Sequence, residues 1–167
     1  MDIRSLRTGI GYDVHRLVEN RDLIIGGVKI DFPLGLLGHS DADILLHAII
    51  DSLLSAANLG DIGKLFPDND QSIKGISSLV LLEKVAEKLA ENQVSIINID
   101  SVVICDKPKL LPYIDEMKGK ISGILKIRKD QIGIKGKTSE KLGFVGAQEG
   151  FESYATCLIY LENENNS

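Results

Sequence analysis

The sequence contains no tryptophan, only two cysteines and only three histidines in 167 residues, and 5% of its residues are aromatic. Two cysteines, Cys105 and Cys157, allow at most one disulfide, which excludes the cysteine-rich scaffolds of small secreted domains. The most apolar region, residues 44–57, is interrupted by His47 and Asp51 and is shorter than the ~18 residues of a membrane span. The first eleven residues hold no apolar stretch typical of a signal peptide. We therefore expect a cytoplasmic domain with no membrane partner.

An excess of positive charge is also lacking, since the formal net charge is −5. Proteins that bind nucleic acid through its phosphates usually need the opposite balance. Residues 107–141 are locally basic, with ten Lys or Arg against four Asp or Glu. This segment is either a solvated surface or a local field for a small anion. No aromatic residues are interleaved with these charges, so we expect no nucleic-acid partner.

The chain has enough apolar residues, 44%, for one domain with its own core, and we treat residues 1–167 as one domain with a frayed tail from about 162. Hydrophobic periodicity predicts strands at 9–15, 23–30, 94–105, 131–135 and 151–161, and helices at 40–57, 77–91 and 112–125. Gly26-Gly27 predicts a turn inside the second strand region. Ser40 is the expected cap of the first helix, with Asp43 three residues later. The apolar side of the second helix is predicted to hold Val80, Leu81, Val85 and Leu89. The alternation of strands and helices predicts a single sheet covered by helices.

The three histidines all fall between positions 15 and 47. Asp13 and His15 are two residues apart on a predicted strand, so their side chains project from one face. His47 lies within an apolar helix, with Asp51 one turn further. A carboxylate with two imidazoles suits a divalent transition metal such as catalytic zinc. The alternatives are a surface position for His15 and a hydrogen-bonded core position for His47.

A polar segment from Gly38 to Asp43 runs into a predicted helix N-terminus, where free N–H groups favour an anion. His39 and Ser40 add donors that could orient a phosphate. Capping of the helix explains the residues from Ser40 to Asp43, but it does not explain His39.

Two further loops carry polar side chains. The aspartates within residues 61–70 could bind sugar-like hydroxyls, although a turn explains the same composition. Gly136-Lys137-Thr138 looks like the end of a P-loop, but the glycine that motif needs at position 131 is Gln131, which excludes a P-loop ATPase. The remaining lysines, hydroxyls and Glu140 suit phosphates held with a hard cation such as magnesium.

Several motifs in one order make the chain resemble the 2-C-methyl-D-erythritol 2,4-cyclodiphosphate synthase family of the non-mevalonate isoprenoid pathway. The motifs are GYDVH from Gly11, IGGV from Ile25, HSD from His39, LGDIGKLFPD from Leu59, PKL from Pro108 and TSEKLGF from Thr138. The resemblance extends from about residue 9 to residue 161. It implies an α+β protomer with a mixed β-sheet and helices packed on one face. It also implies a homotrimer with the sheets around the threefold axis and active sites at the subunit interfaces.

The resemblance further implies a role for individual residues. Asp13, His15 and His47 would bind zinc, and Glu140 would bind magnesium or manganese between the substrate's phosphates. His39 and Thr138 would stabilise the transition state. From its position one turn after His47, and not from the resemblance, we expect Asp51 either to support that metal ligand or to lie on the helix surface. The stretch 105–111 would form the cytidine pocket. The expected substrate contacts are Asp13, Val14, His15, His39, Ser40, Asp61, Ile62, Gly63, Phe66, Pro67, Asp68, Asn69, Asp70, Cys105, Asp106, Lys107, Pro108, Lys109, Leu110, Leu111, Lys137, Thr138, Ser139, Glu140 and Phe144.

The reaction implied is intramolecular: the 2-phosphate of 4-diphosphocytidyl-2-C-methyl-D-erythritol 2-phosphate attacks the β-phosphorus, and CMP leaves. A metal-dependent phosphohydrolase and a non-catalytic trimer that binds CDP or metal are the alternatives. Gly136 departs from the alanine often found in the family, and only backbone contact with cytosine is expected there. Ala147 and Tyr154 replace an arginine and a glutamate of many members, so we expect no isoprenoid diphosphate on the trimer axis.

Overall fold

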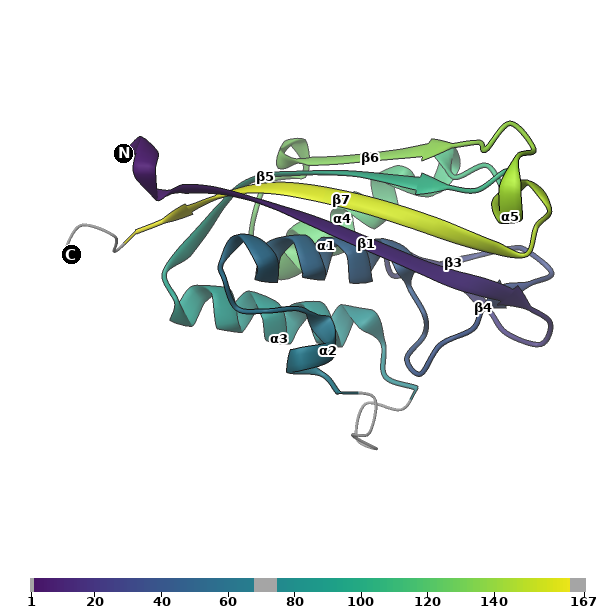
Figure 1. Cartoon of the computed structure of the whole chain (residues 1–167), viewed down its shortest axis with the longest axis horizontal. Helices are drawn as coiled ribbons and strands as arrows, with labels where there is room; N and C mark the ends of the chain where they lie inside the picture. Colours follow the sequence, from purple (N-terminus) through teal and green to yellow (C-terminus); the bar gives the residue numbers. More distant parts are fainter. Residues whose placement is uncertain (1, 68–74, 163–167) are drawn as a thin grey trace.

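The computed structural model describes residues 2–67 and 75–162 of the chain. Five strands form one mixed sheet in the order β4-β1-β7-β5-β6 (Figure 1). These strands are β1 (Leu6–Val18), β4 (Gly35–Leu36), β5 (Val94–Ile104), β6 (Ile132–Lys137) and β7 (Gly150–Leu161). All neighbours pair antiparallel except β5 and β6, which are parallel. The mixed sheet agrees with the predicted α+β class.

A separate hairpin pairs β2 (Leu23–Ile25) with β3 (Val28–Ile30). Gly26 and Gly27 form its turn with φ values of 61° and 71°, a left-handed conformation that glycine adopts without steric cost. The turn is therefore where the sequence predicted it. The prediction of a single sheet is wrong, because these two strands pair with each other and form a sheet of their own.

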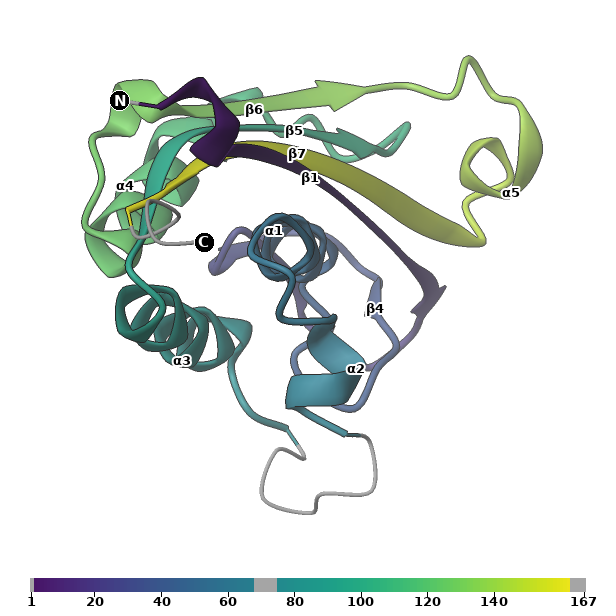
Figure 2. The same ribbon diagram turned by 60° about the vertical axis from the view of Figure 1, so that its left-hand side comes forward.

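The longer helices, α1 (Ile44–Ala56), α3 (Ser78–Glu91) and α4 (Ile114–Leu125), lie on one side of the five-stranded sheet (Figures 1 and 2). Figure 2 looks nearly along α1, which lies in the concave side of the curved sheet. Two one-turn helices, α2 (Ile62–Leu65) and α5 (Gly143–Gly146), and 3-10 turns at Ile3–Ser5, Leu111–Tyr113 and Lys129–Gln131 complete the elements. The sequence predicted the three long helices and missed the one-turn ones. Within the described residues, no helix is long and apolar enough to cross a membrane.

Helix α1 begins at Ile44 and not, as predicted, at Ser40. Ala42 has φ 58°, a left-handed conformation that cannot continue into a right-handed helix. Asp43 is the actual cap, and its carboxylate accepts a hydrogen bond from the Leu46 N–H at 3.0 Å. The Ser40 hydroxyl instead accepts from the Ala42 N–H. Ser40 is thus left outside the helix, where its hydroxyl lies 3.2 Å from a ring nitrogen of His47.

Two glycines of β1 let α1 lie directly on the strand. A Cβ on Gly11 would lie 1.9 Å from the carbonyl oxygen of Ala48, and one on Gly9 would lie 1.9 Å from that of Ser52. Neither strand position could therefore carry a side chain at this separation. Because Asp13 and His15 follow on the same face of β1, this close contact sets their distance from His47 on α1.

The inward face predicted for the second long helix, α3, is confirmed at Leu81, Val85 and Leu89 and is wrong at Val80. Leu81, Leu82, Val85 and Leu89 are buried, whereas Val80 is 38% exposed. Spacings of three and four residues place the buried side chains on one stripe, and Val80 lies outside it. On α4, Met117, Ile121 and Leu125 are buried.

The sheet face opposite the helices carries apolar side chains. Ile10 is 65% exposed, Tyr12 44% and Val14 42%, and Tyr154 of β7 lies directly across from Tyr12, with ring centroids 4.8 Å apart. In the described part of the chain no helix covers this face (Figure 2). Exposed apolar side chains on adjacent strands are typical of a surface that another protein covers.

Candidate active site and metal centre

Asp13, His15 and His47, here called the metal triad, converge between β1 and α1. The Asp13 carboxylate lies 3.0 Å from Nε2 of His15 and 2.9 Å from Nδ1 of His47, and those two nitrogens are 3.4 Å apart. All three ligand atoms lie within 4.8 Å of one another. The side chains are 22%, 20% and 13% exposed, so the triad is open to solvent on one side.

The electrostatics of the triad are those of a carboxylate held between two imidazoles. Burial raises the pKa of Asp13, but hydrogen bonds from His15 and His47 outweigh it and hold the pKa well below its ordinary range. Burial lowers the pKa of His47, and the adjacent Asp13 carboxylate reverses the effect and raises it. One carboxylate oxygen and two imidazole nitrogens are the donors that divalent transition metals prefer. The residues therefore fit a metal ion of this kind.

A cleft of about 420 Å³ opens beside the triad. The metal triad lines this cleft. Six further lining residues are predicted substrate contacts or next to one in the sequence: Gly38, His39, Ser40, Ile62, Gly63 and Phe66. Leu37, Ile76 and Leu81 also line it and were not predicted as contacts. The structure thus brings the predicted metal ligands, the proposed phosphate donors and part of the 61–70 segment into one cavity.

The segment from residue 37 to 42, here called the His39 loop, is held by groups that the sequence did not single out. The Arg21 guanidinium donates to the carbonyls of Gly38 and Ser40 at 2.9 and 2.8 Å. The Gly75 N–H donates to the His39 carbonyl at 2.7 Å. No spacing signal in the sequence links residues 21, 39 and 75, which only the fold brings together.

Asp61 and Asp51 both act on the one-turn helix α2. Asp61 caps it, accepting from the Lys64 N–H at 2.7 Å, and the Asp51 carboxylate accepts from the Ile62 N–H at 2.7 Å. Burial raises the pKa of Asp51. Asp51 therefore fastens α2, whose Ile62 and Gly63 line the cleft, to α1. Pro67 is exposed after α2, and Asp68, Asn69 and Asp70 lie outside the described residues.

The remaining predicted contacts gather in a loop pair, residues 105–111 after β5 and 137–144 after β6. The Asp106 carboxylate joins the two loops, accepting from the backbone and hydroxyl of Ser139 and from the Lys141 N–H. These bonds, that of the Ser139 N–H first, lower the pKa of Asp106. The Thr138 hydroxyl donates to the Glu140 carboxylate. Strands β5 and β6 are parallel, so both loops leave the same edge of the sheet.

The other members of the loop pair differ in exposure. The Cys105 N–H donates to the Lys137 carbonyl, and Leu110 is buried. Lys107, Lys109 and Leu111 are exposed, as is every residue of 137–144 except Ser139, and Pro108 is intermediate. Among the described residues, none of the loop pair lines the cleft beside the metal triad. Val14 points to the opposite face of the sheet, away from the triad. One chain therefore presents two separate groups of predicted site residues.

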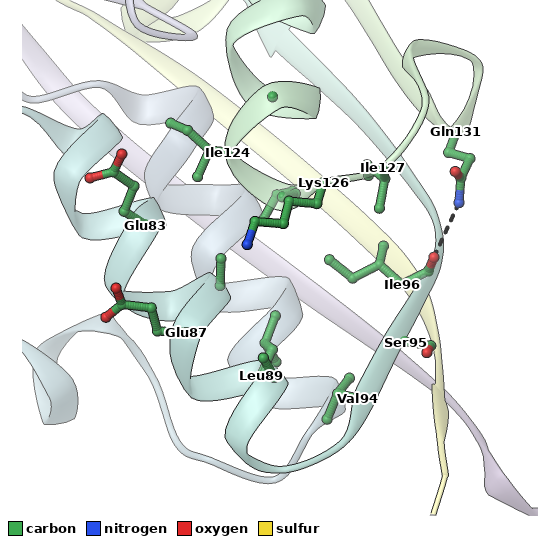
Figure 3. A pocket seen from close by; sticks show the side chains of 14 residues that line it. Glu83, Glu87, Leu89, Val94, Ser95, Ile96, Ile124, Lys126, Ile127 and Gln131 are labelled. Carbon is green, nitrogen blue, oxygen red and sulfur yellow. Dashed lines mark hydrogen bonds between the residues drawn. The ribbon is translucent and has the colours of Figure 1, made fainter.

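A larger cavity of about 770 Å³ lies between α3, α4 and the start of β5 (Figure 3). It holds no predicted site residue. Glu83 and Glu87 stand on one wall and Lys126 on the other, and the Gln131 amide is already bonded to the carbonyls of Ile96 and Ile97. The carboxylate and imidazole donors of the metal triad line the smaller cleft instead.

Comparison with known proteins identifies the family of the chain. The sequence profile of the YgbB family matches residues 6–160. The chain belongs to the YgbB family. The 2-C-methyl-D-erythritol 2,4-cyclodiphosphate synthase of Caldicellulosiruptor bescii is 58% identical over 153 residues, which are 92% of this chain and 98% of the relative.

Two solved structures of YgbB-type folds are also similar. The bifunctional IspDF from Campylobacter jejuni matches with a TM-score of 0.89 and 40% identity over 93% of this chain, which spans 42% of that longer protein. IspF from Plasmodium falciparum, solved as a CDP complex, matches with a TM-score of 0.83 and 36% identity over 97% of this chain and 100% of that one. The resemblance found in the sequence is confirmed.

Proposed function

We propose that this YgbB-family chain converts 4-diphosphocytidyl-2-C-methyl-D-erythritol 2-phosphate to 2-C-methyl-D-erythritol 2,4-cyclodiphosphate and CMP, as a phosphorus–oxygen lyase of isoprenoid precursor synthesis. A non-bridging oxygen of the 2-phosphate attacks the β-phosphorus, and the bond from that phosphorus to the oxygen bridging to CMP breaks. The observation that carries the proposal is the cleft in which the metal triad, His39 and Ser40 face one another in a chain 58% identical to a named synthase.

The protein has to position the two reacting phosphates and neutralise their charge, since the nucleophile is part of the substrate. Asp13, His15 and His47 would hold zinc, and Glu140 would hold magnesium or manganese together with phosphate oxygens. These ions, when bound, neutralise charge on the phosphates. His39 and Ser40 would donate hydrogen bonds to a phosphate, and Thr138 would donate to the charge that develops at the β-phosphorus. Residues 61–63 and 66–70 would contact the methylerythritol part.

We further propose that the complete site forms between chains of a homotrimer. In one chain the loop pair, which would hold the cytidine diphosphate, does not line the cleft of the metal triad. The exposed apolar face of Ile10, Tyr12, Val14 and Tyr154 offers a surface for the contact around the threefold axis. The CDP complex of the P. falciparum relative supports a CDP-type ligand. Free, buried Cys105 and Cys157 suit the reducing cytoplasm.

Assembly is tested by sedimentation of the purified chain. Three copies of the 18.2 kDa chain are expected to sediment together, and Ile10→Glu on the exposed face should dissociate them. Ser55→Ala, an exposed change on α1, is the control and should leave the assembly unchanged. A monomeric wild-type protein that turns over substrate would contradict a shared site.

Activity is tested by a phosphorus NMR time course with the cytidine-diphosphate substrate, zinc and magnesium. Cyclic diphosphate appearing together with CMP is the expected result. CMP with an uncyclised phosphorylated methylerythritol would mean a phosphohydrolase, and no product from a folded, metal-loaded protein would mean a binding module. His47→Ala should abolish turnover with the fold intact, and Ser55→Ala should not. Unchanged turnover in His47→Ala would overturn the zinc assignment.

A further inference from the structure

The two ring nitrogens of His47 face different partners. Nδ1 lies 2.9 Å from the Asp13 carboxylate and 3.4 Å from Nε2 of His15, so it is the nitrogen of the metal triad. Nε2 points away from the triad, 3.0 Å from the hydroxyl of Ser78 and 3.2 Å from that of Ser40. A neutral imidazole can offer a lone pair at Nδ1 only if Nε2 carries the proton.

Ser78 is the first residue of α3, and it is fully buried. Its hydroxyl donates to one oxygen of the Asp41 carboxylate, and its backbone N–H donates to the other at 2.9 Å. Since a serine hydroxyl has one proton and Asp41 takes it, the Ser78 oxygen faces His47 as an acceptor. The chain of bonds then runs in one direction, from the His47 Nε2–H to Ser78 and from Ser78 to Asp41.

Asp41 also joins this chain of bonds to the His39 loop, of which it is a member. The Asp41 N–H donates to the Ile76 carbonyl at 3.1 Å, beside the bond from the Gly75 N–H to the His39 carbonyl. Its carboxylate lies at the N-terminus of the fourteen-residue helix α3, where negative charge is favoured. The position of Asp41 is therefore fixed independently of His47.

We propose that Asp41 and Ser78 are positioning residues that keep the proton of His47 on Nε2 and so present the Nδ1 lone pair to the divalent metal. The pair acts through His47 and touches neither metal nor substrate. Ser40 also lies within hydrogen-bond distance of Nε2. Its hydroxyl accepts from the Ala42 N–H, but among the described residues no carboxylate accepts the Ser40 proton as Asp41 accepts that of Ser78. The inference rests on the proposed metal site and not on the identity of the product.

The test compares Ser78→Ala and Asp41→Asn with Ser77→Ala. Ser77 is the neighbouring cap of α3, and its hydroxyl accepts from the Leu79 N–H, so its removal weakens the same helix end without changing a contact of His47. Zinc affinity is measured by competition with a chromophoric chelator, and fold by thermal unfolding. Ser78→Ala and Asp41→Asn should bind zinc 10–100-fold more weakly, as carriers of hydrogen bonds behind a metal ligand usually do. Ser77→Ala should bind zinc as the wild type does.

A second readout separates positioning from stability. Long-range ¹H–¹⁵N spectra of the imidazole rings report which nitrogen carries the proton, and the chain has only three histidines to assign. Nε2 of wild-type His47 should carry a proton with and without zinc, and Ser78→Ala without zinc should populate the form that is protonated at Nδ1 alone, where the Asp13 carboxylate accepts the bond. Zinc affinity within threefold of wild type in Ser78→Ala, or an equal loss in Ser77→Ala, would overturn the proposal. Wild-type protein that binds zinc but forms no cyclic product would instead contradict the proposed function alone.

Discussion

Replacing Gly11 with alanine should separate the two elements that build the metal triad. The added Cβ would lie 1.9 Å from the Ala48 carbonyl oxygen and 2.8 Å from the Ser52 nitrogen, both backbone atoms of α1. No rotamer change can relieve such contacts, which need roughly 3.5 Å, so α1 must withdraw by ~1 Å or more. Because Gly11 has no positive φ, the effect comes from this contact and not from backbone strain.

The expected cost has two parts. Overpacking of this kind lowers the free energy of unfolding by about 1–3 kcal/mol. A displacement of ~1 Å between His47 and its partners on β1 should lower turnover about 100-fold. Urea unfolding measures the first and initial-rate release of CMP the second. Zinc affinity should fall with turnover, since the ligand atoms now lie 2.9–3.4 Å apart.

The matched control is Gly123→Ala on α4, where an added Cβ meets no heavy atom within 4 Å. That change should raise stability by about 0.5–1 kcal/mol and leave turnover unchanged. If Gly11→Ala is as stable and as active as the wild type, then the contact between β1 and α1 does not set the geometry of the triad, and the reasoning fails.

Four further predictions concern Asp43, Asp51 and the metal. Asp43→Ala leaves three N–H groups, two of them buried, without their acceptor and should lower the free energy of unfolding in urea by about 3 kcal/mol; a loss under 1 kcal/mol would contradict this. Burial raises the pKa of Asp43 from 3.8 to about 6, so the folded state keeps a proton that the unfolded chain releases, and wild-type stability relative to Asp43→Asn should fall by about 2 kcal/mol between pH 4 and pH 6; a flat difference would refute the assignment. Asp51→Ala removes the bond to the Ile62 N–H and should raise KM several-fold with zinc affinity unchanged. Removing metal with a chelator should abolish turnover, and added zinc with magnesium should restore it; activity that survives full removal would exclude a metal role.

The long elements could be predicted from the sequence because their signals are local. The period of two that places Asp13 and His15 on one face, and the glycines between β2 and β3, each depend on a few neighbouring residues. The start of α1 could not be predicted in this way, since Ser40 and Asp43 are both good caps and only the left-handed Ala42 decides between them.

The candidate site likewise contains residues that could be predicted from the sequence and residues that could not. The metal triad was found from residue type and spacing, because imidazoles are rare in this chain. Arg21 and Ser78 were missed, since each acts on the His39 loop or His47 across 17 residues or more. A serine or an arginine in the sequence does not by itself indicate such a contact, because its partner is known only from the fold. For Asp51 the sequence left two alternatives, support of His47 or a position on the helix surface. In the structure its carboxylate instead accepts from the Ile62 N–H, a contact that depends on the one-turn helix α2.

Strand β1 serves two surfaces at once, and this limits how the strand can change. Its even-numbered residues from Ile10 to Val14 form the exposed apolar face, and its odd-numbered neighbours Asp13 and His15 face the helices. Deleting one residue between Gly9 and Tyr12 would exchange the two faces, burying apolar side chains in the cleft and turning metal donors outward. A point substitution can alter one surface alone, whereas inserting or deleting an odd number of residues here exchanges the two faces and so disrupts both surfaces.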